Sequence, residues 1–142
     1  MLFQYYPAPA HNYKYELHKD MNFSAAHFIP AASAGQCARM HGHTYVADIT
    51  VAGNELNEAG FLVNFSDLKK LIHGRYDHTL LNDHEEFTGE SSSEPERYPT
   101  TEVLARQVWE TVEAYLQQFP NKATCLQVLV RETPTSYVIY RP

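Results

Sequence analysis

Apolar and polar residues alternate over two stretches in the first half of the chain. From residue 13 to residue 25 the odd positions carry mostly apolar side chains, and the even positions carry polar ones. From residue 43 to residue 51 the odd positions again carry the apolar residues. A period of two is typical of a half-buried β-strand, because successive side chains point to opposite faces. We expect these two strands to pair as an antiparallel hairpin, joined by a Pro- and Gly-containing loop over residues 28–40.

Two stretches with helical spacing follow the hairpin. Residues 65–72 carry an apolar stripe behind Asn64 or Ser66, either of which can cap a helix. The longest helical pattern begins at residues 100–102 and stops at Pro120. Alternation returns at residues 126–132 and 137–141, on either side of a Thr-Pro-Thr-Ser turn. The order ββααββ predicts an α+β domain, in which a four-stranded antiparallel sheet has two helices packed on one face.

The length and composition restrict the class of protein. A chain of 142 residues is expected to form one domain over residues 1–142, with an N-terminal arm at 1–11 and an exposed acidic loop at 83–99. The formal net charge of −6 argues against nucleic-acid binding. No apolar run has the length of a membrane span, and the first residues lack the features of a signal peptide. We expect a cytoplasmic protein whose two cysteines are free thiols.

Three histidines coincide in the predicted hairpin. His27 ends the first strand, and His41 and His43 begin the second, so all three lie at one end and share the parity of the apolar face. Histidine is a common ligand of zinc. Three imidazoles would leave a fourth zinc position open, as in catalytic sites. Alternatively, Cys37 in the connecting loop could be the fourth ligand of a closed structural site. The spacing leaves both readings open.

Two further groups could carry chemistry. Asp77 precedes His78, which puts a carboxylate next to an imidazole, although adjacent residues need not face each other. Glu132 closes the apolar strand at 126–132. A carboxylate there could accept two adjacent N–H donors of a ligand.

Five segments, in one order, resemble the family of 6-pyruvoyl-tetrahydropterin and 6-carboxy-tetrahydropterin synthases. The resemblance covers about residues 15–140. The matching segments are Phe23-Ser24-Ala25-Ala26-His27, Cys37 with His41-Gly42-His43, Asp77-His78 followed by Leu81-Asn82, Pro99-Thr100-Thr101-Glu102 with Leu104-Ala105, and Glu132-Thr133.

This resemblance implies the tunnelling fold, in which sheets of several subunits join into a barrel and active sites lie at subunit interfaces. It implies a homohexamer and Zn²⁺ held by His27, His41 and His43. The gap of three residues between Cys37 and His41 resembles the bacterial 6-carboxy branch, which makes a queuosine (7-deazaguanine) precursor. That branch converts 7,8-dihydroneopterin triphosphate to 6-carboxy-tetrahydropterin, acetaldehyde and triphosphate.

The resemblance also implies roles for the remaining residues. Cys37, as a thiolate, would move a proton at the substrate's side-chain carbons, and His78, oriented by Asp77, would relay a second proton. The implied pterin-binding residues are Glu132, which would accept from the 2-amino and N3 groups, and Thr101 and Glu102; candidates for the triphosphate are Lys19, Arg39 and Arg131.

Two alternatives stay beside this interpretation. The same fold could make 6-pyruvoyl-tetrahydropterin by triphosphate elimination. A non-catalytic domain could instead use the three histidines and Cys37 as a structural zinc site. The chain departs from the family pattern at Asn64, where relatives often have aspartate, and in the long acidic stretch at 83–99.

Overall fold

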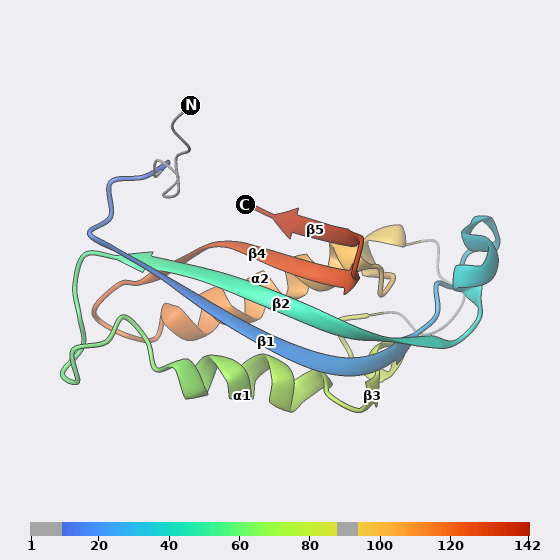
Figure 1. Ribbon diagram of the computed structural model, residues 1–142, viewed down its shortest axis with the longest axis horizontal. Helices are drawn as coiled ribbons and strands as arrows, with labels where there is room; N and C mark the ends of the chain where they lie inside the picture. Colours follow the sequence, from blue (N-terminus) through green and yellow to red (C-terminus); the bar gives the residue numbers. More distant parts are fainter. Residues whose placement is uncertain (1–9, 88–93) are drawn as a thin grey trace.

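The computed structural model describes residues 10–87 and 94–142. There, one sheet is covered on one face by two α-helices (Figure 1). The strands are β1 (Tyr15–His27), β2 (His41–Gly53), β3 (Thr79–Leu80), β4 (Thr124–Thr133) and β5 (Ser136–Tyr140). The α-helices are α1 (Phe65–Tyr76) and α2 (Thr101–Leu116), and the short 3₁₀ helices are η1 (Ala32–Ala38), η2 (Leu81–Asp83) and η3 (Pro95–Arg97).

The α+β class and the two helices are confirmed, but the predicted strand count is wrong. The sheet has five strands in the order β3-β1-β2-β4-β5. The additional strand, β3, pairs in parallel with Ala25 and Ala26 of β1, so the sheet is not wholly antiparallel. Two residues are too few to show a period, which is why alternation could not reveal β3.

The hairpin of β1 and β2 sets the position of everything else. Its register runs without a break from Tyr15 opposite Gly53 to His27 opposite His41. The odd residues of both strands face the helices, as the alternation predicts. The core on this face includes Met21, Phe23, Tyr45, Ala47, Ile49 and Val51, packed with Leu68, Ile72, Leu104 and Val108.

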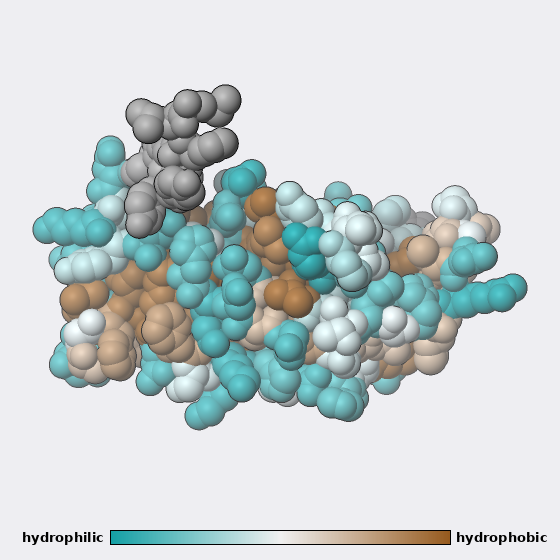
Figure 2. Space-filling model, viewed as in Figure 1, coloured by the Kyte–Doolittle hydropathy of each residue, from teal (hydrophilic) through white to brown (hydrophobic). Residues whose placement is uncertain are grey.

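The opposite sheet face carries no helix among the described elements. Even positions of β1 such as Glu16, His18 and Asp20 are exposed there. In the view of Figure 2, hydrophobic surface gathers toward the end of the molecule where β1 begins. In this view, the end of the hairpin where β1 begins therefore has more hydrophobic surface than the end with His27.

Both α-helices begin at capping side chains. Asn64 Oδ1 accepts from Ser66 N at 2.9 Å, so Asn64 is the cap of α1 and Ser66 is not. Thr100 Oγ1 accepts from Val103 N at 3.2 Å and caps α2. Each cap satisfies an N–H group that has no partner inside the helix.

The described parts of the acidic stretch, residues 83–87 and 94–99, contain hydrogen-bonded and buried groups as well as exposed ones. The Glu86 carboxylate accepts two hydrogen bonds from Arg75 and one from the Tyr76 hydroxyl, and Phe87 is buried. Residues 94–99 include the turn η3. Residues 88–93, and residues 1–9 of the expected arm, lie outside the described residues. No helix in the described part of the chain is long and apolar enough to cross a membrane.

Candidate metal centre

Three imidazoles meet where β1 ends and β2 begins. The ligand atoms of His27, His41 and His43 lie within 4.8 Å of one another. Nε2 of His27 is 3.0 Å from Nε2 of His41, and the centroids of the His27 and His43 rings are 5.1 Å apart. The expected meeting of the three histidines is confirmed, and it follows from the register that pairs His27 with His41.

Backbone carbonyls fix which ring nitrogen faces the group. Nδ1 of His27 donates to the carbonyl of Pro99 at 2.7 Å, and Nδ1 of His41 donates to the carbonyl of Arg39 at 2.6 Å. A neutral imidazole carries one N–H, so each Nε2 presents a lone pair toward the other. Two lone pairs at 3.0 Å repel unless a cation lies between them. The donor set therefore fits a metal ion bound through Nε2.

His43 gives a second indication that this group of histidines fits a metal ion. Its Nε2 is buried and makes no hydrogen bond with any described residue. The nearest carboxylate oxygen, Glu132 Oε1, is 3.3 Å away but not in hydrogen-bonding geometry. A buried polar atom without a partner is rare in folded proteins, and a metal ion would satisfy it.

Burial favours the neutral form of His27 and His43. Burial lowers the pKa of His27, and the charges of His41 and His43 lower it further. Burial also lowers the pKa of His43, against the opposing effect of Glu132. Only the neutral ring can bind a metal, so these shifts extend metal binding to lower pH.

Glu132 approaches the histidines from β4 of the same chain. Its Oε1 is 3.7 Å from His27 Nε2, in addition to the contact with His43. The pairing of β4 with β5 shifts register between Arg131 and Thr133, which leaves Glu132 as the extra residue of a bulge. Glu132 shares the parity of Val128 and Val130, which lie opposite Ile49 and Ala47 of β2. Regular alternation along β4 therefore places its carboxylate on the sheet face that carries His43.

Cys37 lies outside the three-histidine group. It is an exposed free thiol in η1, and its carbonyl accepts from Ile29 N at 2.8 Å. It lines a hollow together with Arg39 and His41, so it lies near one ligand. The described residues thus contain a three-ligand group, to which Cys37 contributes no atom.

Asp77 and His78 do face each other. Nδ1 of His78 is 2.7 Å from Asp77 Oδ2, while Asp77 Oδ1 accepts from the backbone N–H of Ser24 at 2.8 Å. The Ser24 hydrogen bond, and then the interaction with His78, lower the pKa of Asp77. His78 has a φ of 60°, in the left-handed region, and its side chain is 85% exposed. The carboxylate can therefore orient an accessible imidazole.

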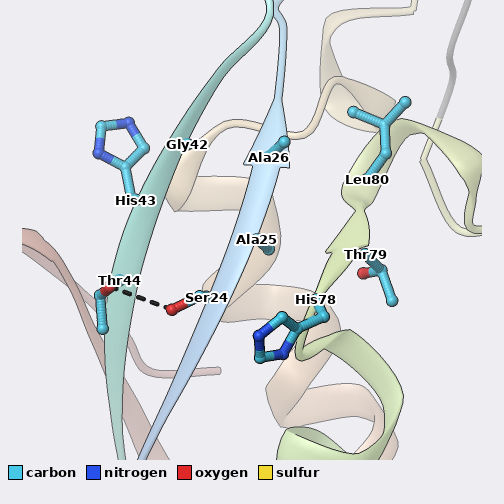
Figure 3. Close-up of a pocket in the computed structure, with 9 residues that line it drawn as sticks. All are labelled: Ser24, Ala25, Ala26, Gly42, His43, Thr44, His78, Thr79 and Leu80. Carbon is cyan, nitrogen blue, oxygen red and sulfur yellow. Dashed lines mark hydrogen bonds between the residues drawn. The ribbon is translucent and has the colours of Figure 1, made fainter.

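The dyad of Asp77 and His78 and the metal centre point to different sides of the hairpin. His78 lines an open hollow of about 560 Å³ with Ser24 and Thr44, whose side chains lie at even positions, and His43 also borders this hollow. Figure 3 shows the His78 ring on their side of the strands, whereas the His43 ring points away from them. Such a volume is within the roughly 300–1,000 Å³ of small-molecule sites. No contact among the described residues joins His78 to the three histidines.

Thr101 and Glu102 occupy the first turn of α2 and differ in exposure. Thr101 is buried and follows the stretch whose Pro99 carbonyl contacts His27. Glu102 is exposed and lines a different hollow, with Arg106 and Tyr140. The segment just before α2 therefore contacts the three-histidine group through Pro99, whereas Glu102 faces a separate hollow.

Comparison with known proteins identifies the group to which this chain is related. Residues 16–142 match the family model of 6-pyruvoyl tetrahydropterin synthase. The chain belongs to this family. It is 62% identical over 144 residues to the 6-carboxy-5,6,7,8-tetrahydropterin synthase of Bacillus subtilis, with 100% of this chain and 95% of that protein covered.

The more distant relatives include proteins of both names, 6-carboxy and 6-pyruvoyl synthases. The 6-pyruvoyl tetrahydrobiopterin synthase of Dictyostelium discoideum is 30% identical over 113 residues, covering 75% of this chain and 74% of its own. The solved structure of 6-pyruvoyl tetrahydropterin synthase from Caenorhabditis elegans has a TM-score of 0.66 at 22% identity. It covers 90% of this chain and 95% of that one, and supports the fold.

The groups that orient the three histidine rings could not be predicted from the sequence. The carbonyls of Pro99 and Arg39 are backbone atoms, which leave no residue-type signal. Asn82 was visible only as part of the segment Leu81-Asn82, with no role attached to it. The structure gives Asn82 specific partners in the chain just after His27.

Proposed function

We propose that this protein is a zinc-dependent 6-carboxy-5,6,7,8-tetrahydropterin synthase. It would convert 7,8-dihydroneopterin triphosphate to 6-carboxy-tetrahydropterin, acetaldehyde and triphosphate, in the cytoplasmic synthesis of a queuosine precursor. The observation that carries the proposal is the convergence of three imidazoles on one point. The 62% identity to the Bacillus subtilis enzyme of that name supports the choice of product.

The three histidines supply the metal-binding part of the chemistry. When bound, zinc would act as a Lewis acid that polarises the side-chain hydroxyls of the substrate and acidifies the neighbouring C–H. The carbonyls of Pro99 and Arg39 would hold two of the rings in the required tautomer. The chain itself thus contributes both the ligands and the groups that orient them.

The remaining residues would bind the substrate and move protons. Cys37, as a thiolate on the rim of the centre, would take a proton from a side-chain carbon, and His78, oriented by Asp77, would relay another. Glu132 would accept hydrogen bonds from the 2-amino and N3 groups of the pterin. The side chains of Thr101 and Glu102 complete the proposed pterin-binding set.

Arg39 is the best placed of the three candidates for the triphosphate. Lys19 is eight residues before His27 in β1, which corresponds to roughly 26 Å along a strand. Arg131 donates to the carbonyl of Pro134 and stacks over the Tyr137 ring. Arg39 instead lines the hollow that holds Cys37 and His41.

A complete site would need more than one copy of the chain. The dyad of Asp77 and His78 and the metal centre point to different sides of one hairpin. A second copy could place its dyad over this metal centre, as the family's hexamer of joined sheets would allow. The separation within one chain supports an oligomer in which active sites lie between subunits.

The decisive experiment is product analysis joined to metal analysis. We expect the purified protein to contain about one zinc ion per chain and to release acetaldehyde from 7,8-dihydroneopterin triphosphate. Formation of the 6-pyruvoyl product without acetaldehyde would instead support the pyruvoyl alternative. An absence of both products would overturn the proposed activity.

Replacement of Cys37 separates catalytic from structural zinc. We expect Cys37→Ala to keep its zinc and its fold while turnover falls by about 10²–10⁴. The matched control is Cys125→Ala, because Cys125 is buried in β4 and burial raises its pKa to about 12. Loss of zinc and of the fold in Cys37→Ala would favour the non-catalytic domain with one cysteine and three histidines as ligands.

A further inference from the structure

The Asn82 side chain holds the main chain immediately after the metal ligand His27. Its Oδ1 accepts from the backbone N–H of Phe28 at 3.0 Å, and its Nδ2 donates to the carbonyl of Phe28 at 2.9 Å. Asn82 is 7% exposed, so these hydrogen bonds are shielded from water. One amide thus pairs both main-chain groups of Phe28, as a neighbouring strand would.

This contact is the last of a series along the outer edge of β1. The series begins at Ser24, whose backbone N–H donates to Asp77 and whose carbonyl accepts from His78 N. The short ladder with β3 follows at Ala25 and Ala26. Asn82 then continues the pairing beyond the end of the strand. The series therefore connects the segment that carries His78 to the segment that carries His27.

We propose that Asn82 is a positioning residue of the metal centre. The inference rests on the proposed function, since it requires the three histidines to bind a metal. The partnered register of β1 with β2 ends at His27 and His41, so the chain beyond this pair lacks a ladder partner. Strand ends without partners fray, and fraying here would let the His27 ring move relative to the other two. Asn82 fixes the main chain of this ligand, while the Pro99 carbonyl fixes its ring.

Asn121 offers a matched comparison at the far end of the hairpin. It is also 7% exposed, and its amide donates to the carbonyls of Glu55 and Leu62. Both carbonyls belong to the connection after β2, away from the metal centre. Asn82 and Asn121 are therefore two equally buried amides that each hold main-chain groups. Only Asn82 does so beside a metal ligand.

The test compares Asn82→Ala with Asn121→Ala in the full-length protein. Zinc affinity is measured by competition with a chromophoric chelator, without substrate, and stability by the thermal midpoint. We expect both variants to lose stability, but only Asn82→Ala to lose zinc affinity, by about tenfold. In the cobalt-loaded protein, Asn82→Ala should also shift the visible absorption bands, whereas Asn121→Ala should leave them unchanged.

Asn82→Asp keeps the test decisive if the alanine variant does not fold. Aspartate retains an acceptor for Phe28 N–H but places a second oxygen against the Phe28 carbonyl, so zinc affinity should again fall. Wild-type zinc affinity and cobalt bands in a folded Asn82 variant would overturn the inference alone. Wild-type protein that binds no zinc at all would overturn the proposed function and this inference with it.

Discussion

The two ends of the β1–β2 hairpin are made from the same pair of strands but are stabilised in different ways. At the end with His27, hydrogen bonds accepted by Asp77, Asn82 and the Pro99 carbonyl hold the structure together. At the other end, Gly53 packs so closely that a Cβ there would lie 2.9 Å from Cδ2 of Leu62. The first end depends on polar groups in fixed directions, whereas the second combines the hydrogen bonds of Asn121 with close apolar packing.

This difference indicates how the chain divides stability and chemistry. Apolar burial is non-directional, so it can contribute free energy of folding without specifying the position of any polar atom. Hydrogen bonds are directional, and they set tautomers and ring orientations in the three-histidine group. We therefore expect changes at the two ends to affect different measurements.

Removal of a ligand at the metal-centre end should give the largest effect. We expect His43→Ala to reduce zinc affinity and turnover by at least about 10³, because the site loses one of three ligands. The fold should persist, since the core lies between the sheet and the helices. Zinc titration and circular dichroism would measure the two effects. His18→Ala is the matched control, because His18 lies on the helix-free face of the same hairpin; equal losses in both variants would contradict the assignment.

Loss of packing at the far end of the hairpin should lower stability and leave zinc affinity unchanged. Leu62 is 6% exposed and contacts Gly53, so Leu62→Ala should lower the free energy of unfolding by about 3 kcal/mol. Zinc affinity per folded molecule should remain unchanged. Urea denaturation and chelator competition would test the two expectations. Leu56→Ala, at a 41% exposed position, should change stability by less than about 0.5 kcal/mol. A fall in zinc affinity for Leu62→Ala would show that the ends are coupled.

The smallest expected effect is a change in the pH dependence of stability, and it comes from Glu86. Burial alone would raise the pKa of Glu86, but hydrogen bonds from Arg75 and Tyr76 outweigh it and hold the pKa at about 2. Because the unfolded-state pKa of 4.5 is higher, this carboxylate stabilises the fold above that pH. The contribution is lost as the pH falls from about 4.5 to about 2.

Glu86→Gln should therefore lower the free energy of unfolding by about 1–3 kcal/mol at pH 7. The difference from the wild type should narrow as the pH falls below about 4.5. Urea denaturation at a series of pH values measures it. Glu85→Gln, at the exposed neighbouring position, should show no such pH dependence; a constant difference for Glu86→Gln would refute the role of its charge.

The sequence was sufficient to place the three histidines, for a physical reason. Alternation fixes the face of each strand residue, and the positions of His27 and His41 fix the end of the hairpin. The contact between Asp77 and His78 was not accessible in this way, because it depends on the left-handed backbone of His78. Glu132 has the parity of Val128 and Val130, but its place beside His43 depends on the pairing of β4 with β2, which joins distant parts of the chain and leaves no local pattern. The strand β3 could not be predicted, because its two residues are too few to show alternation.

The backbone of His78 has a consequence for any attempt to engineer this protein. A residue other than glycine at a φ of 60° is disfavoured by roughly 1–2 kcal/mol, although histidine tolerates the region better than most. Glycine would relieve that strain, so laboratory evolution for heat resistance alone would favour His78→Gly. The same variant would discard the imidazole of the proposed proton relay. A library sorted without an activity screen would therefore converge on stable, inactive sequences at this position.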